Sequence, residues 1–299
     1  MASPNARLAA SLRDRLKNEA RKRGTTLNAM LIRFGLERFL HRLGQSAHRD
    51  RYLLKGAMRL TSWTDLPFRQ TQDLDLASSA TFDAGRVEAD IREICAMTVK
   101  PHDGLVFVSD SLRTESIREA HSHQGLRARF MWALGEARIS NQIDIGFGDL
   151  VTPNPVELEY PALLGMPQAK IRAYPRETVV AEKFEAIVSI GLANSRMKDF
   201  YDLWHLSESF AFDGTQLQEA VRTTFARRST SMPTDLPAGL RDDFAVDSER
   251  AAMWRAFVQR AEIQQAPAFH DVIPQLRRFL MPLAERAVEG KVWDLGNWR

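Results

Sequence analysis

Asp73 and Asp75 are the residues whose type and spacing are best suited to chemistry. They belong to a segment that alternates polar and apolar residues, Thr71-Gln72-Asp73-Leu74-Asp75-Leu76, as a half-buried strand does. Residues two apart on a strand point to the same face, so the two carboxylates are expected side by side, roughly 6–7 Å apart. The negative charges of two neighbouring carboxylates repel each other unless a cation neutralises them. Carboxylate oxygens are ligands that suit Mg²⁺. The same pattern also occurs on solvated strand faces.

A third acid, Asp144, has a similar setting later in the chain. In the run Gln142-Ile143-Asp144-Ile145-Gly146-Phe147, the apolar residues share one face and Asp144 lies on the other. If this strand lies beside the first, three carboxylates converge. Such a group can hold two divalent ions, one activating an attacking hydroxyl and one binding a triphosphate.

A candidate phosphate-binding turn, Lys55-Gly56-Ala57, directly follows a predicted strand and opens a short helix. Such a turn presents backbone N–H groups and the positive end of a helix, where phosphate oxygens bind. An ordinary strand-to-helix turn, with Gly supplying an unusual backbone angle, explains these residues equally well. Thr71 shares the face of Asp73, so its hydroxyl is a further candidate phosphate contact.

These residues need strands to position them, and the pattern predicts a mixed α/β centre between helical ends. Residues 7–43 are predicted as helix in two pieces, the second capped by Thr25 or Thr26. A strand is expected at 105–108 and a hairpin at 128–147, turning near Gly135-Glu136. Five helices are expected later, at 177–192, 198–209, 214–227, 247–262 and 271–287.

Composition excludes several classes of protein. No apolar run reaches the ~20 residues of a membrane helix, and the first 20 residues lack the apolar stretch of a signal peptide. The single cysteine, Cys95, excludes an intramolecular disulfide and a cysteine zinc cluster, and it lies on the apolar face of a predicted helix. We therefore expect a protein of the reducing cytosol. His121 and His123 lack further ligands nearby, so exposed loop positions are favoured for them.

Charge is distributed unevenly along the 299 residues. The whole chain has 41 Lys and Arg, 38 Asp and Glu and a net charge of +3, but residues 1–51 hold 12 basic and only 4 acidic residues. This excess indicates an anionic partner such as nucleic acid for the N-terminal segment. A solvated helix face explains it as well.

The motifs together resemble the AbiEii/AbiGii-type nucleotidyltransferase toxins of the DNA polymerase β-like superfamily. The first motif of that family is matched by Lys55-Gly56-Ala57 and by Arg69-x-Thr71-x-Asp73-Leu74-Asp75, and the similarity continues through 142–149. The most specific matches are Ala181-Glu182-Lys183-Phe184-Glu185-Ala186 and Lys198-Asp199-Phe200-Tyr201-Asp202-Leu203. The resemblance covers roughly residues 5–285.

The resemblance implies a fold and a set of site residues. The fold is α/β (α+β), with a helical segment at 1–50, a mixed-sheet nucleotidyltransferase core at 51–165 and a helical domain at 166–299 that contributes active-site residues. Mg²⁺ is assigned to Asp73 and Asp75, with Asp144 completing the metal site or helping to deprotonate the acceptor. The triphosphate is assigned to Lys183, while Asp202 orients Lys183 or the nucleotide. Lys55, Gly56, Ala57 and Thr71 are the implied phosphate contacts. Asp199 could simply stabilise its helix dipole.

The function implied by the resemblance is that of a cytoplasmic toxin. It would transfer a nucleoside monophosphate from an NTP to the 3′ end of tRNA, blocking aminoacylation, and it would pair with a cognate antitoxin, as in phage defence. No membrane partner is expected. Two alternatives remain open, namely nucleotidylation of a protein or small molecule, and a non-catalytic RNA-binding module.

Overall fold

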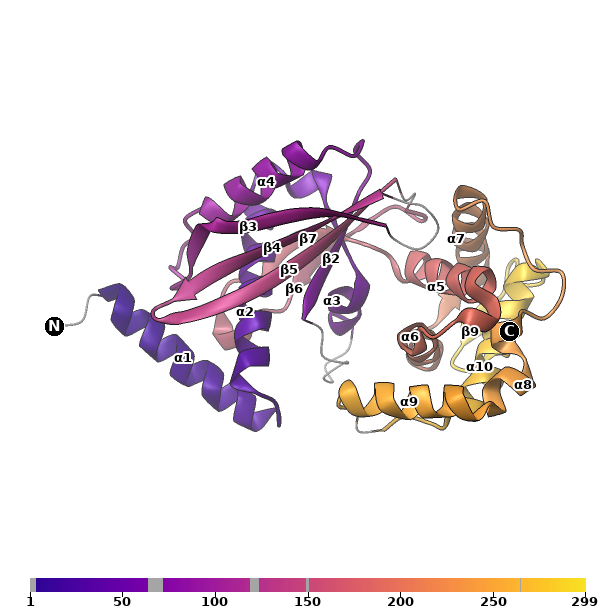
Figure 1. Cartoon of the computed structure of the whole chain (residues 1–299). Helices are drawn as coiled ribbons and strands as arrows, with labels where there is room; N and C mark the ends of the chain where they lie inside the picture. Colours follow the sequence, from indigo (N-terminus) through magenta and orange to yellow (C-terminus); the bar gives the residue numbers. More distant parts are fainter. Residues whose placement is uncertain (1–3, 64–71, 119–123, 149–150, 264) are drawn as a thin grey trace. The chain divides into compact units, whose positions relative to one another are not determined.

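The computed structural model covers residues 1–299 and describes residues 4–63, 72–118, 124–148, 151–263 and 265–299 (Figure 1). Internal contacts divide the chain into two units: Met1–Gly148 with Val156–Ala173, and Asp149–Pro155 with Tyr174–Arg299. The predicted helical segment 1–50 belongs to the first unit. The first unit extends to Ala173, because strand β7 (Ala169–Ala173) pairs with two strands of that unit.

The first unit combines helices with a large sheet. Its helices are α1 (Pro4–Lys22), α2 (Leu27–Gln45), α3 (Gly56–Thr61), α4 (Ala84–Ala96) and the 3₁₀ turns η1 (Arg49–Arg51) and η2 (Leu163–Gly165). Its strands are β1 (Leu53–Lys55), β2 (Asp73–Ser78), β3 (Val106–Arg118), β4 (Gln124–Leu134), β5 (Ala137–Phe147), β6 (Val156–Tyr160) and β7.

The seven strands form one mixed sheet in the order β3-β4-β5-β2-β1-β7-β6. β2 is parallel to β5 and β1 is parallel to β7, whereas the other neighbours are antiparallel. The predicted α/β class and the hairpin around Gly135 are confirmed. The strand expected at 105–108 is much longer, because β3 pairs with β4 as far as Arg118.

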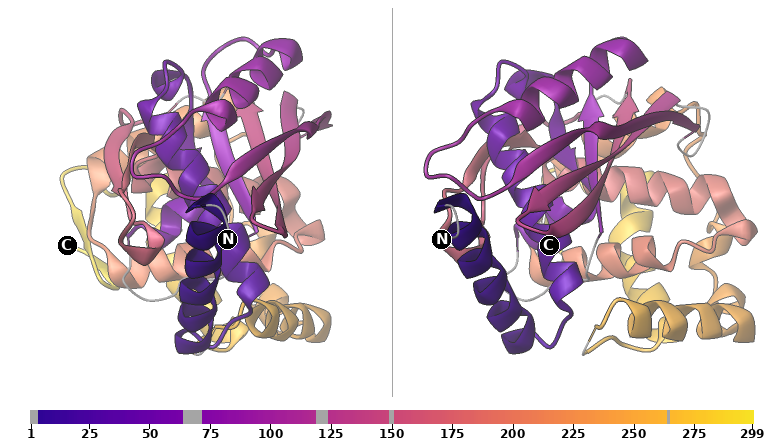
Figure 2. Two further views of the ribbon diagram at one scale, coloured as in Figure 1. Left: turned by 90° about the vertical axis from the view of Figure 1, so that its left-hand side faces the viewer. Right: turned by 60° about the vertical axis from the view of Figure 1, so that its left-hand side comes forward.

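Helices α2 and α4 lie against one face of this sheet (Figures 1 and 2). Leu74 and Leu76 of β2 and Ile143 and Ile145 of β5 point to that face and are almost fully buried in the core. Cys95 of α4 is buried in the same core, as expected. If the pairing of a strand shifted by one residue, its apolar side chains would point to solvent and its polar ones into the core. These buried side chains therefore strongly specify the register.

The first two helices follow the predicted pattern. The side chain of Thr26 caps α2 by accepting a hydrogen bond from the backbone N–H of Ala29 at 3.1 Å. Helix α1 packs on α2, while its basic residues are exposed to solvent. Its buried stripe consists of Ala9, Leu12, Leu16 and Ala20.

The second unit is mainly helical. It contains α5 (Arg176–Ile190), α6 (Met197–Ser209), α7 (Gly214–Arg227), α8 (Asp242–Val246), α9 (Ser248–Arg260), α10 (Phe269–Ala284), η3 (Gly191–Ala193) and η4 (Ala238–Leu240). A small antiparallel sheet joins β8 (Phe212–Asp213), β9 (Val292–Asp294) and β10 (Asn297–Trp298). All five helices expected after residue 176 are confirmed. Within the described parts of the chain, no helix is both long and apolar enough to span a membrane.

Candidate active site

The three predicted carboxylates lie on one face of the sheet, opposite α2 and α4. Asp75 of β2 is the direct neighbour of Asp144 on the parallel strand β5, and Asp73 is the neighbour of Gln142. Asp73 and Asp75 are half-buried, and the side chain of Asp144 is 13% exposed. The two acidic strands therefore lie side by side, as expected, because the buried Leu and Ile residues between the acids specify the register.

The Gly56 turn lies directly against one of these carboxylates. Lys55 is the antiparallel neighbour of Asp75 and is 7% exposed. Gly56 has φ +66°, and a Cβ atom at this residue would lie only 1.9 Å from Oδ2 of Asp75. Only glycine leaves room for that carboxylate. Ala57 is buried in the first turn of α3, so its backbone and not its side chain is available to a ligand.

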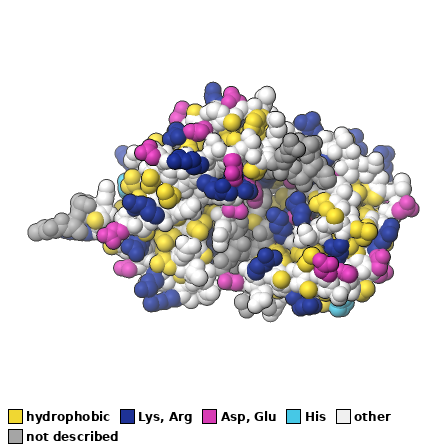
Figure 3. Space-filling model, in the orientation of Figure 1, with side chains coloured by type: hydrophobic (Ala, Val, Ile, Leu, Met, Phe, Trp, Pro, Cys, Tyr) yellow, Lys and Arg dark blue, Asp and Glu magenta, His cyan; other side chains and the backbone are white. Residues whose placement is uncertain are grey.

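Arg127 is part of this face and was not predicted from the sequence. Its Nε and Nη2 donate hydrogen bonds to the two carboxylate oxygens of Asp144, at 2.8 and 2.7 Å. Pairing between five neighbouring strands produces one row of charged residues across the sheet: Glu115, Arg127, Asp144, Asp75 and Lys55. Figure 3 shows basic and acidic side chains side by side over these strands.

The acidic residues around this row stabilise the charged form of Arg127. The hydrogen bonds to Asp144 raise the pKa of Arg127, and the charges of Asp144, Glu115 and Asp73 add to this effect. The donor set of Asp73 and Asp75 consists of hard carboxylate oxygens, which fits Mg²⁺. Asp144 differs, since both of its oxygens accept from Arg127. Across the described ranges, no three Asp, Glu, His or Cys side chains form a group that could hold a metal ion.

A second cluster of predicted residues lies in the second unit, where α5 meets α6. Nζ of Lys183 lies 2.7 Å from Oδ1 of Asp199 and 2.8 Å from Oδ2 of Asp202. Both aspartates are fully buried, and Nε of Arg196 lies 2.5 Å from the second oxygen of Asp199. The expected pairing of Lys183 with Asp202 is present. Asp199, considered above only as a dipole-stabilising residue, is a second partner of the same ammonium group.

Charge pairing outweighs burial in this cluster. Burial alone would lower the pKa of Lys183, but the charges of Asp199 and Asp202 raise it above its ordinary value. Burial would likewise raise the pKa of Asp199, but the charges of Lys183 and Arg196 hold it well below its ordinary value. The Lys183 side chain, 13% exposed, is therefore an ammonium group held in a defined position.

The remaining residues considered from the sequence do not belong to either cluster of charged residues as described. Thr71, His121 and His123 lie outside the described residues. Trp132 and Tyr160 are buried in the core of the first unit, as expected for packing residues.

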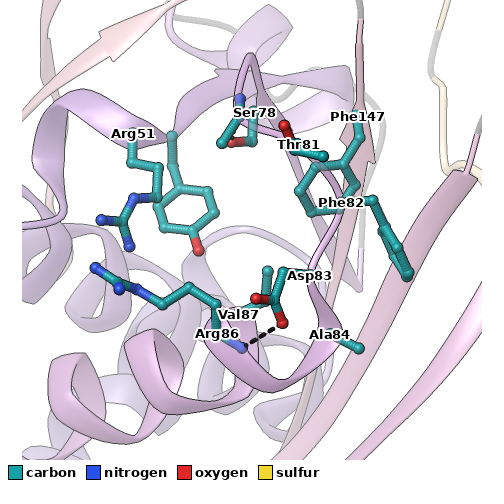
Figure 4. A pocket seen from close by; sticks show the side chains of 11 residues that line it. Arg51, Ser78, Thr81, Phe82, Asp83, Ala84, Arg86, Val87 and Phe147 are labelled. Carbon is teal, nitrogen blue, oxygen red and sulfur yellow. Dashed lines mark hydrogen bonds between the residues drawn. The ribbon is translucent and has the colours of Figure 1, made fainter.

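A cavity of about 580 Å³ in the first unit lies on the other face of the sheet. Ser78 and Phe147, at the ends of β2 and β5, line one side, and Arg51 and Arg86 line another (Figure 4). Both arginines donate hydrogen bonds to the buried carboxylate of Asp90, which anchors this wall. Because Ser78 and Phe147 share the face of the apolar core, the cavity is separate from the carboxylate face.

A protein family and several solved structures are similar to this chain. The family model of the AbiEii nucleotidyl transferase toxin, type IV toxin–antitoxin system, matches residues 38–280. JHP933 from Helicobacter pylori has a similar fold, with 12% identity, a TM-score of 0.50 and coverage of 88% of this chain and 94% of that chain. A candidate nucleotidyltransferase from H. pylori has 14% identity, a TM-score of 0.46 and coverage of 88% and 97%. No curated protein matches. Since the family match spans most of its length, the chain belongs to the AbiEii family of nucleotidyltransferase toxins of type IV toxin–antitoxin systems.

Proposed function

We propose that this protein transfers a nucleoside monophosphate from an NTP to the 3′ end of tRNA. The observation that carries the proposal is the position of Asp75 between the Gly56 turn and Asp144, in a chain of a nucleotidyltransferase family. Nucleotidyl transfer needs donors for a triphosphate next to oxygen ligands for a cation. The Gly56 turn supplies the first and the carboxylates supply the second.

The proposal gives each group a role. Asp73 and Asp75 would hold Mg²⁺, which when bound supplies Lewis-acid stabilisation of the phosphate charge. Lys55 and the backbone of the Gly56 turn bind phosphate oxygens. Lys183, whose ammonium group is held by Asp199 and Asp202, contacts the triphosphate.

The proposed reaction joins the tRNA and the nucleotide through a new phosphodiester. The terminal ribose hydroxyl attacks the α-phosphorus, the bond to the β-phosphate oxygen breaks, and pyrophosphate leaves. The hydroxyl proton passes to water. Extension of the 3′ end covers the site of aminoacylation, so we propose that the toxin acts on cytoplasmic tRNA, with phage defence as its setting and with the antitoxin that its family implies.

Incubation of the purified protein with total RNA, Mg²⁺ and each α-labelled NTP tests the proposal. We expect label in tRNA with the wild type, and at least a 100-fold loss in D75N and K183Q, the usual scale for removing a charge-stabilising group. D110N and K291Q, which change exposed residues, are the matched controls and should remain active. Label appearing only in protein or in a small molecule would refute tRNA as the acceptor.

A further inference from the structure

The cavity at the ends of β2 and β5 lies where ligand pockets of α/β proteins usually form. Its volume of about 580 Å³ is within the roughly 300–1,000 Å³ of small-molecule pockets. Ser78 and Phe147 line it from the carboxyl ends of these two parallel strands, and Ala84 lines it from the start of α4. In open α/β sheets, ligands bind outside the carboxyl ends of such strands. The cavity is therefore large enough and well placed for a small molecule.

One wall of this cavity is cationic. Arg51 donates a hydrogen bond to Oδ2 of Asp90, and Nε of Arg86 donates to Oδ1 of the same carboxylate at 3.3 Å. The hydroxyl of Tyr52 also donates to Oδ2, at 2.7 Å. Burial would raise the pKa of Asp90, but the hydrogen bonds from Arg51 and Tyr52 hold it below its ordinary value. Asp90 thus holds two guanidinium groups close together with a single negative charge between them.

The two guanidinium groups keep donors for a second anion. The bonds to Asp90 use Nη1 of Arg51 and Nε of Arg86, so other N–H groups of each arginine are left for a ligand. The Arg51 side chain is 29% exposed and that of Arg86 is 60% exposed. Asp83, which also lines the cavity, accepts from the backbone N–H of Arg86 at 3.0 Å and so offsets the positive end of α4. A phosphate group between the two arginines would balance their remaining positive charge.

A second wall of the cavity is aromatic. Phe82 meets Phe147 edge to face, with ring centroids 5.2 Å apart and an interplanar angle of 89° (Figure 4). Phe147 is buried and supports Phe82, which is only partly buried and lines the cavity. Ser78 and Thr81 also line the cavity and supply hydroxyl groups. An aromatic ring is a suitable platform for a nucleobase, and hydroxyl groups can bind the polar edge of the base.

We propose that this cavity binds a free nucleoside monophosphate, with the phosphate on Arg51 and Arg86 and the base on Phe82. The combination of walls carries the assignment, because an inorganic anion needs only the arginines and a purely apolar ligand needs only the aromatic rings. The cavity lies on the face of the sheet opposite Asp75 and Asp144. It is therefore a second site, separate from the proposed transfer reaction and not dependent on it.

Equilibrium dialysis with each labelled nucleoside monophosphate, in EDTA and without RNA, tests the assignment independently of transfer activity. We expect one nucleotide per wild-type chain, and an affinity about 10-fold lower in R86Q and in F82A. Labelled inorganic phosphate should bind more weakly, and F82A should leave its affinity unchanged. R92Q, which changes an arginine of α4 that pairs with Glu88 outside the cavity, is the matched control and should bind nucleotide normally, as should D75N. If F82A is unstable, F82L removes the ring while keeping an apolar side chain.

Three results would overturn this assignment. Nucleotide binding that D75N weakens, and that R86Q and F82A leave unchanged, would place the nucleotide at the carboxylate face instead. Equal affinities for phosphate and nucleotide would make the cavity a site for an inorganic anion only. No binding of any of the monophosphates to the wild type at millimolar concentration would show that the cavity is not a nucleotide site. All three results leave the proposed transfer reaction intact, because that reaction is measured separately with NTP and RNA.

Discussion

Gly56 is the residue whose identity the candidate site requires most strictly. Its φ of +66° is costly for other residues, and its missing side chain leaves the space that the carboxylate of Asp75 occupies. The neighbouring Ala57 carries no such requirement, because its buried side chain faces the core. The glycine thus couples the conformation of the turn to the position of the Asp75 carboxylate.

We predict that Gly56→Ala lowers kcat by about 100-fold, because the new Cβ must move the Asp75 carboxylate by an ångström or more. Steady-state kinetics of NMP transfer, with circular dichroism as a check on folding, measures the effect. Gly85→Ala is the matched control, since its Cβ would meet only one atom, at 3.6 Å, in an ordinary helical conformation. Equal activity of the two variants would contradict the role of Gly56.

Residue chemistry could be predicted from the sequence only where a local pattern specified it. Alternation placed Asp73, Asp75 and Asp144 on strands, and their expected adjacency is confirmed by the register. Arg127 could not be predicted, because its partner depends on which residue of the neighbouring strand lies opposite. Alternation indicates a face, but cross-strand register follows from packing of the whole sheet.

At the scale of elements, helices α5 and α6 together position Lys183 through its ion pairs with Asp199 and Asp202. The spacing of Asp199 and Asp202 indicated that both lie on one side of a helix, but it did not indicate what faces them. The structure shows a buried ion pair with Lys183 on α5. The length of strand β3 likewise could not be predicted from its own residues, since its charged second half forms a strand through pairing with β4.

The buried ion pair predicts how the stability of the second unit depends on pH. The folded-state pKa of Asp199 lies below its ordinary value of 3.8, so its stabilisation is present above about pH 4 and is lost as the pH falls further. Asp199→Asn should lower the free energy of unfolding at pH 7 by about 3 kcal/mol and make it less sensitive to acid. Urea unfolding at pH 7, 4 and 3, followed by tryptophan fluorescence, measures both effects.

The exposed Asp235 offers a control for this prediction. Asp235→Asn should leave the stability at pH 7 and its decrease in acid as in the wild type. A wild-type and an Asp199→Asn protein with parallel stability profiles between pH 7 and 3 would show that Asp199 does not contribute through its charge.

At the scale of the whole molecule, the uneven charge of the chain corresponds to a structural feature. The basic residues of α1 lie on its exposed side, and the apolar stripe packs inward. This arrangement fits both a solvated helix and a surface for tRNA phosphates, the two alternatives that composition left open. The division into two units, by contrast, depends on the pairing of β7 and was not evident from composition.

We predict that α1 contributes to tRNA affinity by neutralising phosphates. Replacing Arg13, Lys17 and Arg21 by Gln should weaken binding and make the plot of log affinity against log salt shallower by about 0.7–0.9 for each phosphate that is no longer neutralised. Filter binding between 50 and 200 mM salt measures this slope. The control removes three exposed basic residues of the second unit, R255Q, R260Q and K291Q. If the α1 substitutions leave this slope unchanged, the basic residues of α1 do not contact tRNA phosphates and only face solvent.

The carboxylate face is proposed to modify tRNA 3′ ends. Sequencing tRNA 3′ ends from cells that express the chain without its antitoxin, as wild type or as D75N, tests it most directly. We predict added nucleotides on tRNA from wild-type cells, in parallel with growth arrest, and neither in D75N cells. Growth arrest by the wild type with unchanged tRNA 3′ ends would contradict the account.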